Sequence, residues 1–366
     1  MPDQHNTPVE RAQRLAQRNL LEEMFALRDL QRETRGKGLW HLHGDDLPWE
    51  LNRQGLMRWY MHPKLDDIAV NSLVVYVQRI PPGSRSGKQT GPGETVIFVL
   101  AGRGYTLLNE KKHEWQAGDC INFPVLPEGV TYQHFNTDAD HEALFIVAEP
   151  NFADPLGVDR GAVLDQLENC PEYDAQHPSS RSSAKLGPPV KAAVFEAERI
   201  LEPGPRPPGS YEESLWQEAA RYHRALTGKV VIRQSDRPWT HSRQGTTLTF
   251  LSSSRFQDTA VMSWRVFLRK QTAHSGKHRH QGGLVIFVVE GEGYSVVNGE
   301  RVDWRAGDLL LLPIKPGGIE HQHFSRDPNK PCKWLALIYE PLWYGAGSVM
   351  QHVSGEAAPE APGHKP

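Results

Sequence analysis

The chain has 366 residues, of which 38% are hydrophobic and 23% charged, as in an ordinary soluble globular protein with room for two domains. Its formal net charge of −3 argues against nucleic acid or an anionic membrane as the main partner, because both require a basic surface. The longest apolar runs, such as 284–289, are too short to span a bilayer.

The cysteines and the N-terminus indicate the compartment. Cys120, Cys170 and Cys332 are scattered and show no CxxC spacing, which favours buried free thiols in a reducing environment. Residues 1–19 are polar and lack the apolar stretch of a secretory signal. We therefore expect a cytoplasmic protein.

The first half of the chain is expected to contain a helical arm and a β domain. Residues 1–65 form the arm: apolar residues recur at helical spacing over 8–35, and 36–65 looks irregular. From 66 to 155, short β-branched runs alternate with Gly, Pro and Asn, which is typical of an all-β barrel or sandwich.

The second half repeats this order. Residues 156–245 form a connector with a proline-rich stretch at 201–211 and a predicted helix at 213–226. The β pattern returns over 246–350. The remaining tail, 351–366, has little apolar content and is expected to be disordered.

An internal repeat links the two β regions. Residues 275–308 align without a gap on 86–119, at an offset of 189 residues, and about 16 of the 34 positions are identical. At the same offset, His278, His280 and His321 correspond to Gln89, Gly91 and Tyr132. The chain therefore contains a duplicated unit in which one copy carries three histidines.

The repeated unit resembles the two sequence motifs of the cupin superfamily. In the second copy, these motifs are Gly276, His278 and His280, then Gly291, Gly307-Asp308 and Pro313, and finally His321. The last motif departs from the family pattern, because Ser325 replaces its asparagine. The resemblance covers roughly 66–150 and 246–341, and it implies an all-β fold of two tandem jelly-roll barrels.

The histidines of the second copy suggest a metal site. His278 and His280 alternate by two, so on a strand both side chains point to one face. His321 and His323 compete for the third ligand position. The motif register favours His321, and so does the first copy, which keeps His134 at the place of His323.

The ligand set is expected to contain no carboxylate. The positions where many cupins supply a glutamate are Leu284 and Val285. Three neutral imidazoles leave open positions for substrate and dioxygen, and they favour an anionic, chelating substrate. Imidazoles suit zinc, copper and nickel as well as iron, so the ligands do not identify the metal.

The first copy is expected to lack a metal site. Glu94 and His134 alone do not form one, so this barrel is given a structural or dimerisation role, with a weak or vestigial site as the alternative. Cupin barrels commonly pair through exposed sheets, so we expect a homo-oligomer, either a dimer or a tetramer.

The stretch around the histidine pair, HRHQGGLVIFVVEG at 278–291, resembles the corresponding stretch of gentisate and salicylate ring-cleaving dioxygenases. The resemblance implies an Fe(II) centre, with Mn, Ni, Zn or Cu as alternatives, that cleaves a hydroxylated aromatic acid with dioxygen. In that family the iron lies in the N-terminal cupin, whereas the competent copy here is C-terminal.

Two other classes of function remain open. One is a metal-dependent lyase, isomerase or decarboxylase that acts on a small carboxylate without oxidation. The other is a non-catalytic binding or storage bicupin, which the complete three-histidine set disfavours.

The candidate substrate residues lie on the strand before the histidine pair. Arg265, Phe267 and Arg269 share one face of this strand and Trp264 the other, and alternation does not decide which face points inward. An arginine suits a substrate carboxylate, and Trp264 is a candidate for an aromatic wall. His323, if it is not a ligand, is a candidate acid/base catalyst.

Overall fold

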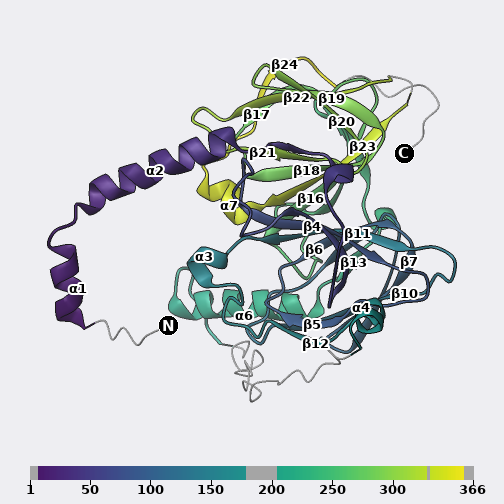
Figure 1. Ribbon diagram of the computed structural model, residues 1–366, viewed down its shortest axis with the longest axis horizontal. Helices are drawn as coiled ribbons and strands as arrows, with labels where there is room; N and C mark the ends of the chain where they lie inside the picture. The colour runs from purple at the N-terminus through teal and green to yellow at the C-terminus, as the bar shows by residue number, and fades with distance from the viewer. Residues whose placement is uncertain (1–6, 179–203, 328–329, 358–366) are drawn as a thin grey trace.

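The computed structural model describes residues 7–178, 204–327 and 330–357 and shows two stacked β bodies (Figure 1). Each body contains one seven-stranded and one five-stranded sheet, and the paired strands in them are antiparallel. The expected all-β fold of two tandem barrels is confirmed. Within the described residues, no helix combines the length and apolar character that a membrane crossing requires.

The first barrel is built from strands in the order β13-β9-β6-β11-β4-β3-β2 and β12-β5-β10-β7-β8. Their bounds are β2 (Glu50–Asn52), β3 (Gly55–Met61), β4 (Leu73–Ile80), β5 (Lys88–Gly91), β6 (Val96–Ala101), β7 (Arg103–Leu108), β8 (Lys111–Gln116), β9 (Cys120–Asn122), β10 (Val130–Asn136), β11 (Ala143–Pro150), β12 (Asp165–Glu168) and β13 (Val231–Ile232).

The second barrel has the orders β1-β21-β18-β23-β16-β15-β14 and β20-β19-β22-β17-β24. Its strands are β1 (His41–Leu42), β14 (Trp239–Ser242), β15 (Gly245–Leu251), β16 (Trp264–Gln271), β17 (Lys277–His280), β18 (Leu284–Glu290), β19 (Glu292–Val297), β20 (Glu300–Arg305), β21 (Leu309–Leu312), β22 (Ile319–Ser325), β23 (Cys332–Tyr339) and β24 (Gln351–Ser354).

Helices lie outside the barrels. They are α1 (Pro8–Leu15), α2 (Leu20–Lys37), α3 (Ala153–Leu156), α4 (Pro171–Gln176), α6 (Tyr211–Thr227) and α7 (Glu340–Gly345), with short 3-10 turns η1 (Gly44–Asp46) and η3 (Gln234–Asp236). The helix expected at 213–226 is α6. The expected N-terminal helix is present as α1 and α2, which project from the barrels and bury no residue (Figure 1).

Parts of the expected arm and tail differ from their expected structure, because they belong to the sheets of the barrels. Within the expected arm 1–65, β2 and β3 extend the first barrel's sheet next to β4. Residues 351–354, expected to be disordered, form β24 beside β17 because its backbone groups find partners there. Of the proline-rich stretch and the tail, 201–203 and 358–366 lie outside the described residues.

The two barrels exchange short strands. β1 from the N-terminal arm pairs with β21 of the second barrel, with His41 opposite Leu310. β13, which precedes the second barrel in sequence, pairs with β9 of the first, with Val231 opposite Ile121. The chain segment that enters each barrel therefore completes the sheet of the other.

The seven-stranded sheets pack against each other and share one hydrophobic core. Phe98 of the first barrel meets Phe250 of the second with ring centroids 5.7 Å apart, and Tyr60 meets Phe287 at 5.9 Å. This shared core covers the face that each seven-stranded sheet turns toward the other barrel, whereas the interior of each barrel has a separate hydrophobic core.

Candidate metal centre

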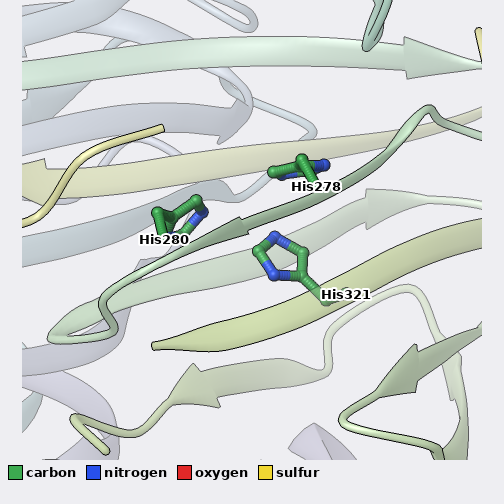
Figure 2. Close-up of side chains that lie close together, drawn as sticks. All are labelled: His278, His280 and His321. Carbon is green, nitrogen blue, oxygen red and sulfur yellow. The ribbon is translucent and has the colours of Figure 1, made fainter. Parts of the chain in front are cut away.

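The three predicted ligands come from neighbouring strands of the second barrel. β17 carries His278 and His280, and β22 places His321 directly opposite His278. Their candidate ligand nitrogens all lie within 4.8 Å of one another. Figure 2 shows the three rings gathered around one region between the strands. The structure thus brings together the three histidines that the sequence predicted.

Backbone carbonyls orient each ring. The Nδ1 atom of His278 lies 2.9 Å from the Gly276 carbonyl oxygen, and that of His280 lies 2.6 Å from the Gln281 carbonyl oxygen. His321 Nδ1 lies 3.3 Å from the oxygen of Ile319. A carbonyl can only accept, so each Nδ1 carries the proton and each Nε2 keeps a free lone pair. That tautomer is the one a metal ligand requires.

Burial keeps these imidazoles neutral. It lowers the pKa of His278 to about 3 and that of His280 to about 4. The hydrogen bonds to the backbone carbonyls raise both pKa values, but by less than burial lowers them. Burial lowers the pKa of His321 well below its ordinary value, and the neighbouring imidazoles lower it further. Since protonated imidazole cannot bind a metal, these shifts favour metal binding well into the acid range.

The donor set fits a first-row transition metal. Three neutral nitrogen donors on one side leave coordination positions on the other, as in sites that bind a substrate beside the metal. Leu284 lines the pocket next to the histidines and Val285 is buried in the shared core, so neither position supplies a carboxylate. The residues present therefore fit a metal held by imidazoles alone.

A pocket of about 230 Å³ opens over the three histidines. One part of its wall is apolar and aromatic: Phe267, Leu284, Ile286, Leu312, Trp334 and Trp343. Another part carries hydroxyl groups and an arginine: Thr247, Thr249, Ser252, Ser254 and Arg255. A pocket of this size and lining suits a small organic molecule with an apolar side and a polar side.

The structure decides the orientation of β16. Arg265, Phe267 and Arg269 line the pocket. Trp264, the sequence candidate for the aromatic wall, points the other way: it is fully buried in the shared core, and its indole N–H donates to the Glu94 carbonyl oxygen at 2.9 Å. Alternation along the strand imposes these opposite directions.

Arg269 is a buried cation with unused donors. Its side chain is 4% exposed, and Nη2 donates to Gln244 Oε1 at 3.1 Å. Its Nε and Nη1 atoms have no hydrogen-bond partner within the described residues. Burial lowers the pKa of Arg269 to about 9. The Phe267 and Trp334 ring centroids lie 5.6 and 5.2 Å from the guanidinium, but neither ring satisfies these donors, so the buried charge is well suited to an anion that enters the pocket.

Arg265 has a partial partner. Its Nε lies 3.8 Å from the Glu340 carboxylate, and its guanidinium lies 4.7 Å from the Trp343 ring centroid. Burial lowers the pKa of Arg265, and Glu340 partly offsets this effect. Arg265 therefore has less unsatisfied capacity for an anion than Arg269.

His323 lies beneath the cluster and does not line the pocket. Its Nδ1 is 2.7 Å from Ser295 Oγ, which also accepts from Trp304 Nε1 at 2.8 Å. The first barrel has the same arrangement: His134 Nδ1 lies 2.7 Å from Thr106 Oγ1, which accepts from a tryptophan. Because this network also occurs in the barrel without the three histidines, it belongs to the barrel framework.

Some pocket residues gave no clear signal in the sequence. Trp343, on α7, lies 4.9 Å from His280 between ring centroids, and Gln244, in the loop before β15, binds Arg269. Both lie outside the repeated motifs, and only the folding of α7 and β15 over the mouth of the barrel brings them to the histidines. The spacing of residues in the sequence does not reveal that the Gln244 amide hydrogen-bonds to the buried Arg269.

The first barrel has a different arrangement at the equivalent place. Tyr132 donates its hydroxyl proton to Gln89, and Gly91 offers no side chain. Glu94 binds Arg160 at 2.8 Å and accepts from Tyr339 of the second barrel, so its carboxylate joins the two barrels. Among the described residues, no group of potential ligands with metal-site spacing occurs here.

The comparisons with known proteins agree with this geometry. Residues 264–338, which contain all three histidines, match the family described as "Cupin domain". Gentisate 1,2-dioxygenase from Ralstonia sp is 39% identical over 87 residues, which are 24% of this chain and 23% of the relative. 5-Aminosalicylate 1,2-dioxygenase from Comamonas sp is 27% identical over 96 residues, 26% of this chain and 25% of the relative.

Each alignment spans a quarter or less of the length of these curated relatives. Solved structures of oxalate decarboxylase from Bacillus subtilis cover more of the chain. One, at pH 4.6, has a TM-score of 0.52 and 13% identity over 83% of this chain and 76% of that chain. Another, a tryptophan-to-tyrosine variant of that enzyme, has a TM-score of 0.53 and 14% identity over 83% of this chain and 78% of that chain. These likenesses show the fold of a bicupin.

Proposed function

For this chain of two cupin barrels, we propose an Fe(II)-dependent dioxygenase that cleaves the ring of a hydroxylated aromatic acid at the second barrel. The observation that carries the proposal is the placement of Arg269, whose unpaired donors share one small pocket with three metal-competent imidazoles. The local similarity to gentisate and 5-aminosalicylate dioxygenases supports this substrate class.

The metal ligands and the substrate-binding residues would have separate roles. His278, His280 and His321 would hold the metal through their Nε2 atoms. When bound, iron supplies Lewis acidity and redox chemistry with dioxygen. Arg269 would hold the substrate carboxylate, and Gln244 would fix the direction of the guanidinium.

The apolar wall would position the ring. Phe267, Trp334 and Trp343 line one part of the pocket and would exclude water from that side. Arg265 and the Trp343 ring stack against each other, which would keep this wall rigid. We place His323 in a packing role under the metal ligands and not in proton transfer, because its network recurs in the first barrel.

A second candidate is a non-oxidative lyase or decarboxylase acting on a small carboxylate. The hydroxyl-bearing part of the wall, with Thr247, Ser252 and Arg255, favours it, because those groups suit a compact polar anion. Both candidate functions need the three histidine ligands and Arg269.

Oxygen consumption separates the two. We expect protein purified without oxygen and loaded with Fe(II) to consume about one dioxygen per substrate with at least one member of a panel of hydroxybenzoates and aminosalicylates. His321→Gln should abolish this activity and lower the iron content, whereas His323→Gln should retain iron. An iron-loaded protein that turns over a small carboxylate without oxygen would establish the second candidate instead.

A further inference from the structure

A second cluster of ligand-type side chains lies on the opposite sheet of the second barrel, where the N-terminal arm crosses it. His41 is in β1, His43 follows it, and Asp308 lies between β20 and β21. His41 Nε2 and His43 Nδ1 each lie 3.1 Å from Asp308 Oδ2. These atoms are within 4.8 Å of one another, as in the three-histidine cluster.

The carboxylate is held in place by the backbone around it. Asp308 is 1% exposed. Its Oδ1 accepts from the Gly44 N–H at 3.2 Å, and its Oδ2 accepts from the Arg305 N–H at 3.0 Å. Burial raises the pKa of Asp308, but His41 and these N–H groups outweigh it, so the net shift is downward. The group is therefore an anion at neutral pH.

The arm is shaped to reach this carboxylate. A Cβ atom on Gly44 would lie 2.3 Å from the Gly307 carbonyl oxygen and 2.6 Å from the Tyr60 hydroxyl oxygen. Tyr60 itself donates to that carbonyl at 2.6 Å. Only a glycine lets the backbone approach closely enough for both histidines to meet Asp308.

The first barrel shows what the same place contains without this cluster. The pairing of β1 and β13 aligns His41 with Val231 and His43 with Arg233, and Asp119 corresponds to Asp308. Burial raises the pKa of Asp119, and the nearby Arg233 guanidinium offsets part of the shift. In the second barrel, His43 stands in place of Arg233, and an imidazole nitrogen, unlike a guanidinium, can serve as a metal ligand.

We propose that His41, His43 and Asp308 bind a structural divalent transition metal of the zinc type, which fastens the N-terminal arm to the second barrel. Two imidazole nitrogens and one carboxylate oxygen form a common zinc donor set. Tetrahedral ligands about 2.0–2.1 Å from zinc lie about 3.3 Å apart, close to the two nitrogen–oxygen distances observed. The 44% exposed side chain of His43 leaves the remaining position open to water.

The site would join segments far apart in sequence. It would clamp β1 onto β21 beside the hairpin that ends at Arg305, and thereby secure the exchanged strand. This inference does not depend on the dioxygenase proposal, since the two clusters share no residue and lie on different sheets.

Zinc stoichiometry tests the proposal. Full-length protein is stripped with a chelator, incubated with Zn²⁺, desalted and analysed for metal per chain. We expect His278→Gln/His280→Gln protein to retain one zinc, and the further change His43→Gln to remove it. The matched control His62→Gln, which removes an imidazole from the strand end after β3, should leave that zinc in place.

The half-exposed His43 is chosen because its loss should leave the fold intact, which circular dichroism checks. If the double variant fails to fold, the wild-type background gives the same answer: two zinc ions per chain, falling to one in His43→Gln. No zinc in the folded double variant, or the same zinc content after His43→Gln, would show that the cluster is held by hydrogen bonds alone.

Discussion

At the scale of single residues, charge and burial define the pocket more sharply than residue type does. Three arginines line the pocket over the histidines, Arg255, Arg265 and Arg269, and of these Arg269 is the buried one, with two donor atoms that have no hydrogen-bond partner among the described residues. Arg279 lies between two ligands in sequence, yet it points to solvent and pairs with Glu320 at 2.8 Å. Arg269 and Arg279 therefore form a matched pair, one buried in the pocket and one on the surface.

Replacing Arg269 with Met should weaken binding of an aromatic carboxylate by about 2–4 kcal/mol, or roughly 30- to 1,000-fold, because the anion loses its buried charge partner. The stability of the ligand-free protein should be unchanged or higher, since the variant removes a buried charge that has no acidic partner. Calorimetric titration and urea unfolding measure the two effects. Arg279→Met is the control, and equal losses in both variants would contradict the role of Arg269.

At the scale of elements, the exchanged strand β1 depends on a close approach of two backbones. Gly44 lies two residues after β1, at the start of η1, and a Cβ atom on it would lie 2.3 Å from the carbonyl oxygen of Gly307, in the turn before β21. Gly36, near the end of α2, has nothing within 4 Å of its potential Cβ. The same substitution should therefore have opposite effects at these two glycines.

We expect Gly44→Ala to lower the free energy of unfolding by about 1–3 kcal/mol, because the Cβ can be accommodated only by moving the arm or the turn. Gly36→Ala should raise the stability by up to about 1 kcal/mol, since alanine favours an exposed helix. Urea denaturation of both variants measures the difference. A Gly44→Ala protein as stable as wild type would show that β1 is not held tightly.

At the scale of the whole molecule, buried histidines couple stability to pH. Besides the cluster, burial lowers the pKa of His134 to about 3 and that of His323 well below its usual range. In the unfolded chain these groups titrate near 6.5. Below about pH 6.5 the unfolded state therefore binds more protons than the folded state.

The stability of metal-free protein should thus fall as the pH decreases from about 6.5 to about 4, by up to about 1.4 kcal/mol per pH unit for each buried histidine. Urea unfolding at pH 7.5, 6.0 and 5.0 in the presence of a chelator measures this slope. His278→Gln should reduce the pH dependence of stability by the contribution of one buried histidine. A stability independent of pH over this range would mean that the histidines bind protons in the folded state.

The sequence by itself determined the duplication, the two β barrels and the three histidines. Each of these follows from local pattern: alternating strands, glycine turns and the spacing of His278 and His280. The register of the repeat also pointed to His321, and the structure places it opposite His278.

Only the tertiary structure decided which face of β16 points inward, and so separated Arg269 from Trp264. It alone showed the strand exchange that brings His41 and His43 to Asp308, more than two hundred residues away. Local spacing fixes which side chains share a face of a strand. Which face is buried depends on the other strands and the second sheet that pack against it, and those come from distant parts of the chain.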